Sequence, residues 1–571
     1  MKEESKRQRY EILRTQLHNE RSSFEPQWRD INDFILPASG RFFISDVNRG
    51  ARRNLDIINS SGTMAANTLH AGMMSGVTSP ARPWFRLASQ DPDLNEFGKV
   101  KAWNSLVADR MNAVFLKSNL YQMLPYRELG GFGTAPMSVE EDINSVIHCA
   151  AYPIGSYYVA KDERGMINVF YREWQMSIRN VVAKFGRKDG DGNWDWSNFS
   201  KLIRDQYERG MYETYIIIAH VISPNEDYKE GSPFSQHKKF SSCYYERGFS
   251  GSTGNRNYMN GPDDNKYLRE SGFDYFPVLC PRWWVTGEDV YATDCPGMTA
   301  LGDVKQLQHS EKKFGKALDR MVDPTMVMPT DMANQQKNML PGGIIFADER
   351  EGSKGIRSAY DVNLRIDHLD AKMSKIEYRI SRAFYEDLFL MLANTDRRQI
   401  TAREIDERHE EKLLALGPVL ERLNQDLLNP LIDITFDSML KQGMIPPPPE
   451  ELQGQQLKVE YISIMNQAQK MIGVSVQERF LNTVIAIAPV QPQVWDKVDI
   501  DQYIDVYGEN LSVSPGVIRS DEAVAEIRAQ MAEQQRARAM AEAAPQMAGA
   551  AKTLSETDTE KDSALKQLMN I

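Results

Sequence analysis

The feature that most limits how this chain can fold is a pair of long amphipathic segments on either side of an insert rich in proline and glycine. The first segment spans residues 299–322, and Asp323-Pro324 ends it because proline disfavours helix in the residue before it. The second spans about 362–392. Each carries apolar residues at three- and four-residue steps, which predicts one buried helix face per segment. The apolar positions are Leu301, Val304, Leu307, Phe314, Leu318 and Met321 in the first, and Leu364, Ile366, Leu369, Met373, Ile376, Ile380, Phe384 and Leu388 in the second.

Two helices of this length, joined by one insert, form an antiparallel hairpin about 40 Å long. Their apolar stripes are wider than one partner helix covers, so we expect the remainder to be buried against other copies or another domain. The alternative is that both helices pack inside one large globular domain. Periodicity alone favours neither interpretation over the other.

The insert over residues 324–361 is bounded by Pro324, Pro329 and the run Pro341-Gly342-Gly343. A polar loop, residues 393–400, follows the second helix and contains the basic doublet Arg397-Arg398. The doublet can contact phosphate, and a solvated turn explains it equally well. Thr401 and Glu404 then form a capping box for a helix to about residue 442, which we expect to bend at Gly417-Pro418 and Asn429-Pro430.

Composition narrows the class of protein. The chain has 571 residues, of which 41% are apolar and 26% charged, as in an ordinary soluble protein. No apolar run reaches membrane-helix length, and the start of the chain has no signal-peptide pattern, which predicts synthesis in the cytoplasm. The four cysteines are widely spaced, which predicts reduced thiols and no zinc site. A net charge of −11 disfavours tight general binding of nucleic acid but is compatible with a protein that surrounds DNA without gripping it.

Around the hairpin the pattern predicts a mixed α+β, predominantly helical chain. We expect helices over residues 3–36, 60–77 and 99–117, the second rich in small residues and therefore closely packed. Between residues 138 and 247 short β-prone runs predominate, with a hairpin turn at 162–165. After a polyproline spacer at 446–449 we expect helices at 464–472, 476–488 and 520–543, and a disordered tail at 548–561.

Motifs for catalysis or metal binding are missing from the sequence. There is no phosphate-binding loop, no HExxH and no GxSxG. Residues 189–193 imitate the start of a calcium loop but lack its later glycine and glutamate, so a turn is the better interpretation. His309 and His368, one on each long helix, are better explained as solvated side chains than as a metal pair. We therefore predict no enzyme activity, no cofactor and no metal.

Several motifs together resemble the head-to-tail connector, or portal, proteins of short-tailed bacteriophages. They cover most of residues 25–470. The matching stretches are residues 28–37, 65–80 (AANTLHAGMMSGVTSP), 83–87 (PWFRL), 118–121, 131–135, 155–158, 171–173, 276–277, 281–283 and 296–298.

The resemblance implies a portal fold in which residues 1–296 and the long kinked helix over 401–443 form the wing. Residues 297–323 and 362–392 would be the two stem helices, 324–361 the clip and 393–400 the tunnel loop. Residues 444–518 would form a helical crown and 519–571 a C-terminal helix with a disordered tail.

The implied function is a ring of about twelve copies at one capsid vertex, through which double-stranded DNA is packaged and ejected. By the same likeness the clip, with Pro324, Pro329, Pro341, Gly342 and Gly343, would meet terminase and later the tail adaptor proteins. Major capsid and scaffold proteins would be further partners, in the virion and with no membrane. Arg397, Arg398 and Lys372 would give a few phosphate contacts in the channel. The alternatives are another structural ring or adaptor of a virion and, less favoured, a tail-associated enzyme.

Overall fold

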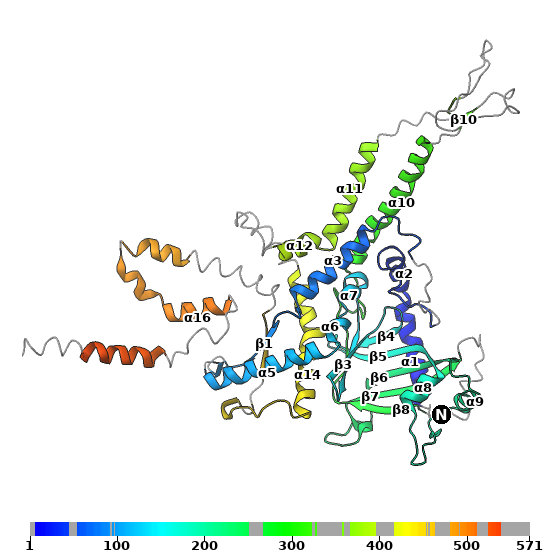
Figure 1. The fold of residues 1–571 in the computed structure, drawn as a ribbon, viewed down its shortest axis with the longest axis horizontal. Coiled ribbons are helices and arrows are strands. Elements are labelled where there is room, and N and C mark those ends of the chain that lie inside the picture. Colours follow the sequence, from blue (N-terminus) through cyan, green and yellow to red (C-terminus); the bar gives the residue numbers. More distant parts are fainter. Residues whose placement is uncertain are drawn as a thin grey trace, which may run out of the picture. The chain divides into compact units, whose positions relative to one another are not determined.

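The fold combines helices with antiparallel sheets, and about half of the chain is helical, which confirms the predicted α+β class (Figure 1). The computed structural model describes residues 6–44, 54–91, 94–95, 97–249, 267–322, 326–327, 357–358, 366–394, 416–452, 454, 457–462, 480–489, 491–510 and 524–537. The capping box at Thr401, the expected helix at 464–472 and the expected disordered tail lie outside these residues.

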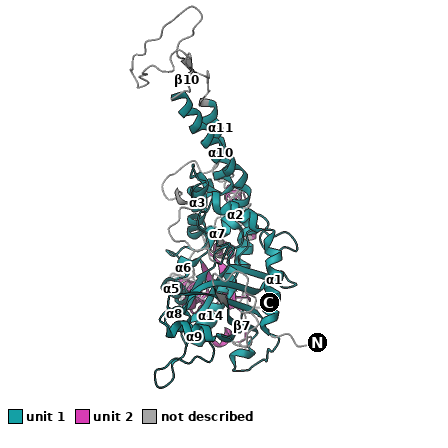
Figure 2. Cartoon of the chain, turned by 90° about the vertical axis from the view of Figure 1, so that its right-hand side faces the viewer, with its two compact units in different colours: residues 1–84, 109–446, 463–469 teal, residues 85–108, 447–462, 470–571 magenta. Residues whose placement is uncertain are grey.

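The chain divides into two compact units (Figure 2). The first comprises residues 1–84, 109–446 and 463–469, and the second comprises residues 85–108, 447–462 and 470–571. The first unit contains both predicted long helices and the β-rich region.

Two helices, and not the single predicted helix, occupy the start of the described chain. α1 spans Lys6–Ser22 and α2 spans Glu25–Phe34. Pro26 lies in the first turn of α2, where its missing N–H costs nothing. Inside a continuous helix the same ring would remove a hydrogen bond and collide with the turn before it, so the chain breaks at Ser23 and Phe24.

Five antiparallel strands form the largest sheet, in the order β4-β5-β6-β7-β8. The strands are β4 Tyr157–Lys161, β5 Ile167–Ser177, β6 Tyr215–Pro224, β7 Phe240–Phe249 and β8 Arg269–Phe273. The N–H of Asp162 donates to the carbonyl of Met166 over 2.8 Å, which confirms the predicted turn between β4 and β5.

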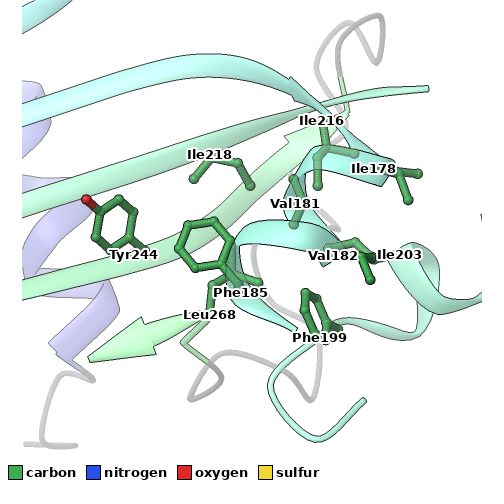
Figure 3. Packing of buried hydrophobic residues seen from close by; sticks show 10 residues of the cluster. All are labelled: Ile178, Val181, Val182, Phe185, Phe199, Ile203, Ile216, Ile218, Tyr244 and Leu268. Carbon is green, nitrogen blue, oxygen red and sulfur yellow. The ribbon is translucent and has the colours of Figure 1, made fainter. Parts of the chain in front are cut away.

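Helices cover both faces of this sheet. On one face, α8 (Ile178–Phe185) and α9 (Lys201–Glu208) bury a cluster that includes Ile216 and Ile218 of β6 (Figure 3). On the other, α1 buries Tyr10 and Leu17 against residues such as Val221. The alternation along β6 assigns its side chains to the two faces.

A small buried ionic network fixes α1 to its face of the sheet. The carboxylate of Glu173, only 6% exposed, accepts hydrogen bonds from Arg14, Arg247 and the hydroxyl of Tyr158. Arg247 also pairs with Glu11 of α1. Because each buried charge has an opposite partner, the network avoids the penalty of an unpaired ion.

A second sheet consists of β2 Met137–Asp142, β3 Val146–Ala151 and β9 Val278–Leu279, in the order β3-β2-β9. The helix α14, Asn429–Lys441, packs against β2 and β3. A helix at 416–423 and a π-helical turn, Asn424–Leu428, precede it. The irregularity predicted at Asn429-Pro430 thus takes the form of a π turn, since Pro430 has no N–H to close the ordinary helical bond to Asp426.

α3, Ser61–Gly76, is the helix around which the first unit is packed, and its close packing confirms the interpretation of its small residues. α7 (Tyr126–Phe132), α10 (Pro296–Val322), α11 (Ile366–Ala383) and α12 (Glu386–Asn394) all contact it. Val304 of α10 lies against Gly62, and the ring of Phe389 in α12 lies against Gly72. A Cβ atom at Gly72 would collide with that ring.

The prediction of one continuous second long helix is wrong in its last third, because the chain breaks there between α11 and α12. Tyr385 lies at the break with a φ of 55°, a conformation that side-chain-bearing residues rarely adopt. The turn allows both Phe384 and Phe389 to be buried, and it brings the Tyr385 ring 6.2 Å from that of Trp283. Apolar spacing continues across the break, so periodicity cannot reveal it.

The second unit contains one short antiparallel sheet, in which β1 (Phe85–Ser89) pairs with β12 (Leu457–Tyr461). The predicted helix over 99–117 is confirmed as α5, Gly98–Lys117, which runs from this unit into the first. Nearer the C-terminus, helices occupy residues 480–487, Ile500–Asn510 (α16) and 524–537. Asp501 and Arg528 form an ion pair of 2.6 Å between the last two.

Substitution Gly72→Ala tests the packing of α12 on α3. The added methyl has no room beside Phe389, so we expect the free energy of unfolding to fall by about 1–3 kcal/mol. Gly315→Ala on α10, where a Cβ atom meets nothing within 4 Å, is the matched control and should raise it by up to about 1 kcal/mol. Urea unfolding measures both. Equal midpoints for the two variants would contradict the close contact.

Candidate functional site: the α10–α11 hairpin

α10 and α11 lie side by side and antiparallel, as predicted (Figures 1 and 2). Arg379 of α11 pairs with Asp303 of α10 over 2.8 Å, which fixes the register near the base. Beyond the helix ends, β10 (Met326–Val327) pairs antiparallel with β11 (Arg357–Ser358), and Met326 lies opposite Ser358. The same alignment therefore continues from the base of the hairpin into the insert.

The apolar stripe of the hairpin is buried only near its base. Val304, Leu307, Met373, Ile376 and Ile380 are all buried. Towards the insert, by contrast, apolar side chains of α10 are exposed to solvent. Leu318, Met321 and Val322 are 43%, 40% and 79% exposed. Exposed apolar surface of this kind marks an interaction site. This favours the interpretation in which the rest of the stripe is covered by another molecule.

A polar clamp holds the base of the hairpin to the segment before α3. The side-chain carbonyl of Gln308 accepts from the N–H groups of Ile58 and Asn59, at 2.7 and 2.9 Å, and its amide donates to the carbonyl of Asn59 at 2.6 Å. The side-chain amide of Asn59 donates to both Glu311 and Glu377, at 2.9 and 2.8 Å. One amide thus links the two helices on this side.

Two further polar contacts at the base lie on the side of this clamp. Ser61 also donates to Glu377, and Lys305 pairs with Asp30 of α2 over 2.6 Å. Helix geometry places Lys305, Gln308 and Glu377 on this side, and Asp303 with Arg379 on the opposite side.

Along that opposite side α11 carries a basic stripe, defined here as Lys372, Lys375, Arg379 and Arg382. Steps of three and four residues place them on one helix face. Lys372 is exposed, and it forms no ion pair with another residue that the structure describes. Only Arg379 of the stripe has such a pair. The predicted contact residue Lys372 therefore belongs to a larger cationic surface, which can attract an anion along several helical turns.

The remaining predicted site residues lie outside the described part of the chain. These are Arg397 and Arg398 of the polar loop, and Pro324, Pro329, Pro341, Gly342 and Gly343 of the insert. Their roles stay predictions.

The described residues offer little chemistry for catalysis. They hold no cluster of three or more His, Cys, Asp or Glu side chains placed to bind a metal ion. His309 and His368 are both exposed. The four cysteines are free and buried, as expected for reduced thiols, and burial raises the pKa of Cys295 to about 12. Among the described helices, none has the length and apolarity to cross a bilayer.

The calcium-like run is a turn, which confirms that interpretation of the sequence. The N–H of Asp189 donates to the carbonyl of Asn193 at 2.9 Å. Lys188 and Trp194 pair through an isolated antiparallel β-bridge. Gly192 has a φ of 81°, the left-handed conformation that such a turn requires.

The clamp was not predicted from the sequence, although one signal for it was present. Gln308 interrupts the apolar stripe of α10 next to Leu307 and is only 5% exposed. A polar residue at a buried helix position indicates a hydrogen-bond partner inside the fold. The identity of that partner, the backbone of residues 58 and 59, is not written in the local pattern.

Substitution Gln308→Ala tests the clamp. It leaves the amides of Ile58 and Asn59 without their acceptor, so we expect a loss of about 2 kcal/mol in the free energy of unfolding. Hydrogen exchange at these two amides should accelerate. Gln306→Ala, an exposed position on the same helix, is the control and should change neither measurement. Unchanged exchange at residues 58 and 59 in Gln308→Ala would exclude the clamp.

Known proteins resemble this chain over nearly its whole length. The model of the family described as "Bacteriophage head to tail connecting protein" matches residues 7–518. The portal protein of Salmonella phage epsilon15 is 45% identical over 560 residues, which cover 97% of this chain and 96% of that protein. The probable portal protein of Bordetella phage BPP-1 is 40% identical over 552 residues, 96% of this chain and 95% of that protein. The chain therefore belongs to the family of bacteriophage head-to-tail connecting, or portal, proteins.

Proposed function

We propose that about twelve copies of this chain form a closed ring at one vertex of the capsid, and that DNA enters and leaves the head through the centre of the ring. The observation that carries the proposal is the uncovered hairpin. Its apolar stripe continues beyond the part that the chain itself buries, and one long side of it carries an exposed basic stripe.

The contacts at the base indicate which side faces the channel. Asp30, Asn59 and Ser61 all reach the hairpin on the side of the clamp. In a ring, the bulk of each subunit lies outside the narrow channel wall. The clamp side is therefore turned away from the channel, towards the outside of the ring and the neighbouring copy, and the basic stripe of α11 faces inwards.

A channel with this charge distribution holds DNA weakly. Lys372, with Arg397 and Arg398 of the loop, makes a few phosphate contacts. Salt screens the attraction between these charges and the phosphates at separations beyond about 10 Å. The net charge of −11 keeps the rest of the protein from binding the polyanion. DNA can then slide through the ring, which packaging and ejection both require.

The remaining parts take the roles that the family resemblance assigns. Residues 297–323 and 362–392 form the stem, 324–361 the clip, 393–400 the tunnel loop and 444–518 the crown. Residues 1–296 and 401–443 form the wing, which meets the capsid and scaffold proteins. The clip binds terminase during packaging and a tail adaptor afterwards. In this proposal the chain has no catalytic activity of its own.

The native mass of the purified protein tests the ring. We expect particles near twelve times the 65.2 kDa chain mass by mass photometry, with a central hole in negative-stain images. A protein that stays monomeric or dimeric at high concentration, both alone and with its scaffold protein, would contradict the proposal.

Reversing the charge of the loop tests the DNA contacts. We expect Arg397→Glu with Arg398→Glu to lower the DNA content of assembled particles by about tenfold or more, because phosphate contacts become repulsions. Rings should still form with the normal mass. The control, Arg397→Lys with Arg398→Lys, keeps both charges and should package normally. Unchanged packaging and retention with the glutamates would rule out the contact role.

A further inference from the structure

A second basic stripe lies on α10, on the side opposite to its buried residues. It consists of Lys313, Lys316 and Arg320, all exposed, spaced three and four residues apart. Asp319 lies at the edge of this helix face. No ion pair joins any of the three to another described residue, in contrast to Lys305 further down the helix, which pairs with Asp30. These cations therefore have no partner within the described chain.

The clamp side of α11 has the opposite charge. Asp370, Ser374 and Glu377 lie along it, and no Lys or Arg does. Glu377 is occupied by Asn59 and Ser61. Asp370 lies about two turns further towards the insert, is exposed, and has no described ion-pair partner. Beside this acidic face the ring of Tyr378 is 59% exposed.

The two unpaired groups lie at the same height along the hairpin. Asp303 lies opposite Arg379, and Asn59 links Glu311 to Glu377. In an antiparallel pair with this register, Asp370 is level with about residue 315 of α10. That position is between Lys313 and Lys316. The charges do not pair within one copy, because the cations point away from the seam between the two helices.

We propose that the stripe Lys313, Lys316 and Arg320 of one copy packs against the face around Asp370 and Tyr378 of the next copy. The inference rests on the ring proposed above and names the surfaces that join its stems. The contact is heterologous, since a different face is used on each partner, and it repeats around the ring until it closes. Opposite charges at equal height also set the register between neighbouring hairpins.

A second copy explains both surfaces, whereas DNA would explain only one. Phosphate would suit the cations of α10 but would be repelled by Asp370. A neighbouring hairpin supplies the carboxylate and an aromatic ring together.

Disulfide trapping in assembled rings tests this contact. In Lys316→Cys with Asp370→Cys, mild oxidation should link each copy to the next and give a ladder of multiples of the chain mass on a non-reducing gel. Each single variant should remain at the mass of one chain. The four native cysteines are buried and should not contribute.

Lys316→Cys with Lys372→Cys is the matched control. Lys372 belongs to the basic stripe on the other side of α11, so this pair should give no ladder. Closed rings that show no ladder for the Lys316–Asp370 pair, or an equal ladder for the control, would overturn the inference and leave the ring standing. A wild-type chain that forms no ring would overturn both.

Charge exchange gives an independent measurement. Lys316→Glu should raise the protein concentration needed for half-assembly by about tenfold, because an attraction at every interface becomes a repulsion. Lys316→Glu combined with Asp370→Lys should restore it towards the wild-type value. Rings that assemble equally well in the single variant would contradict the proposed pairing.

Discussion

The hairpin owes its position to the close packing of its base on α3. Gly72 lets the Phe389 ring of α12 approach the α3 backbone more closely than any side chain would permit, and Gly62 leaves Val304 of α10 a tight contact with the same helix. Close-packed interiors tolerate no added methyl group at such points. The left-handed conformation of Tyr385 follows from this contact, because only a break after α11 lets both Phe384 and Phe389 be buried. Where α11 ends is thus decided by α3, a helix distant in the sequence.

The clamp makes the two long sides of the hairpin different. Glu311 and Glu377 share one amide of Asn59, so two like charges are held together without a described cation between them. Their repulsion is tolerable because both remain partly open to water, where the effective dielectric is high. A hairpin with identical sides would have no preferred orientation. With one side covered and acidic, the basic side of α11 is left as the open one.

Periodic parts of the fold could be predicted from the sequence, and local breaks could not. The long helix α10, the small-residue helix α3 and the turn after β4 follow from spacing and turn chemistry that act over a few residues. The breaks between α1 and α2 and between α11 and α12 interrupt apolar patterns that continue across them. Pro26 was a readable signal for the first break, whereas nothing near Tyr385 announces its positive φ.

The same limit applies to the candidate site. The position of Lys372 on an exposed helix face follows from periodicity, and so do its neighbours in the stripe. Gln308 is visible as a polar residue in an apolar stripe, but its partners come from a segment some 250 positions earlier in the chain. A contact of that separation depends on the tertiary fold and has no local sequence signature.

In the ring proposed above, the sorting of charge over the hairpin reconciles an acidic protein with the passage of DNA, a polyanion. Were all cations of α10 and α11 free in a channel, the repeated subunits would line it with dozens of positive charges and hold DNA tightly. Pairing Lys313, Lys316 and Arg320 with the acidic face of a neighbour removes them from the field that the DNA meets. The stripe of α11 then remains in the proposed channel, with Arg397 and Arg398 of the loop, and Asp303 already neutralises one member of the stripe. The interface and the weakness of the grip are in this way two results of one charge pattern, because every cation used to join neighbours is a cation that cannot hold the passing DNA.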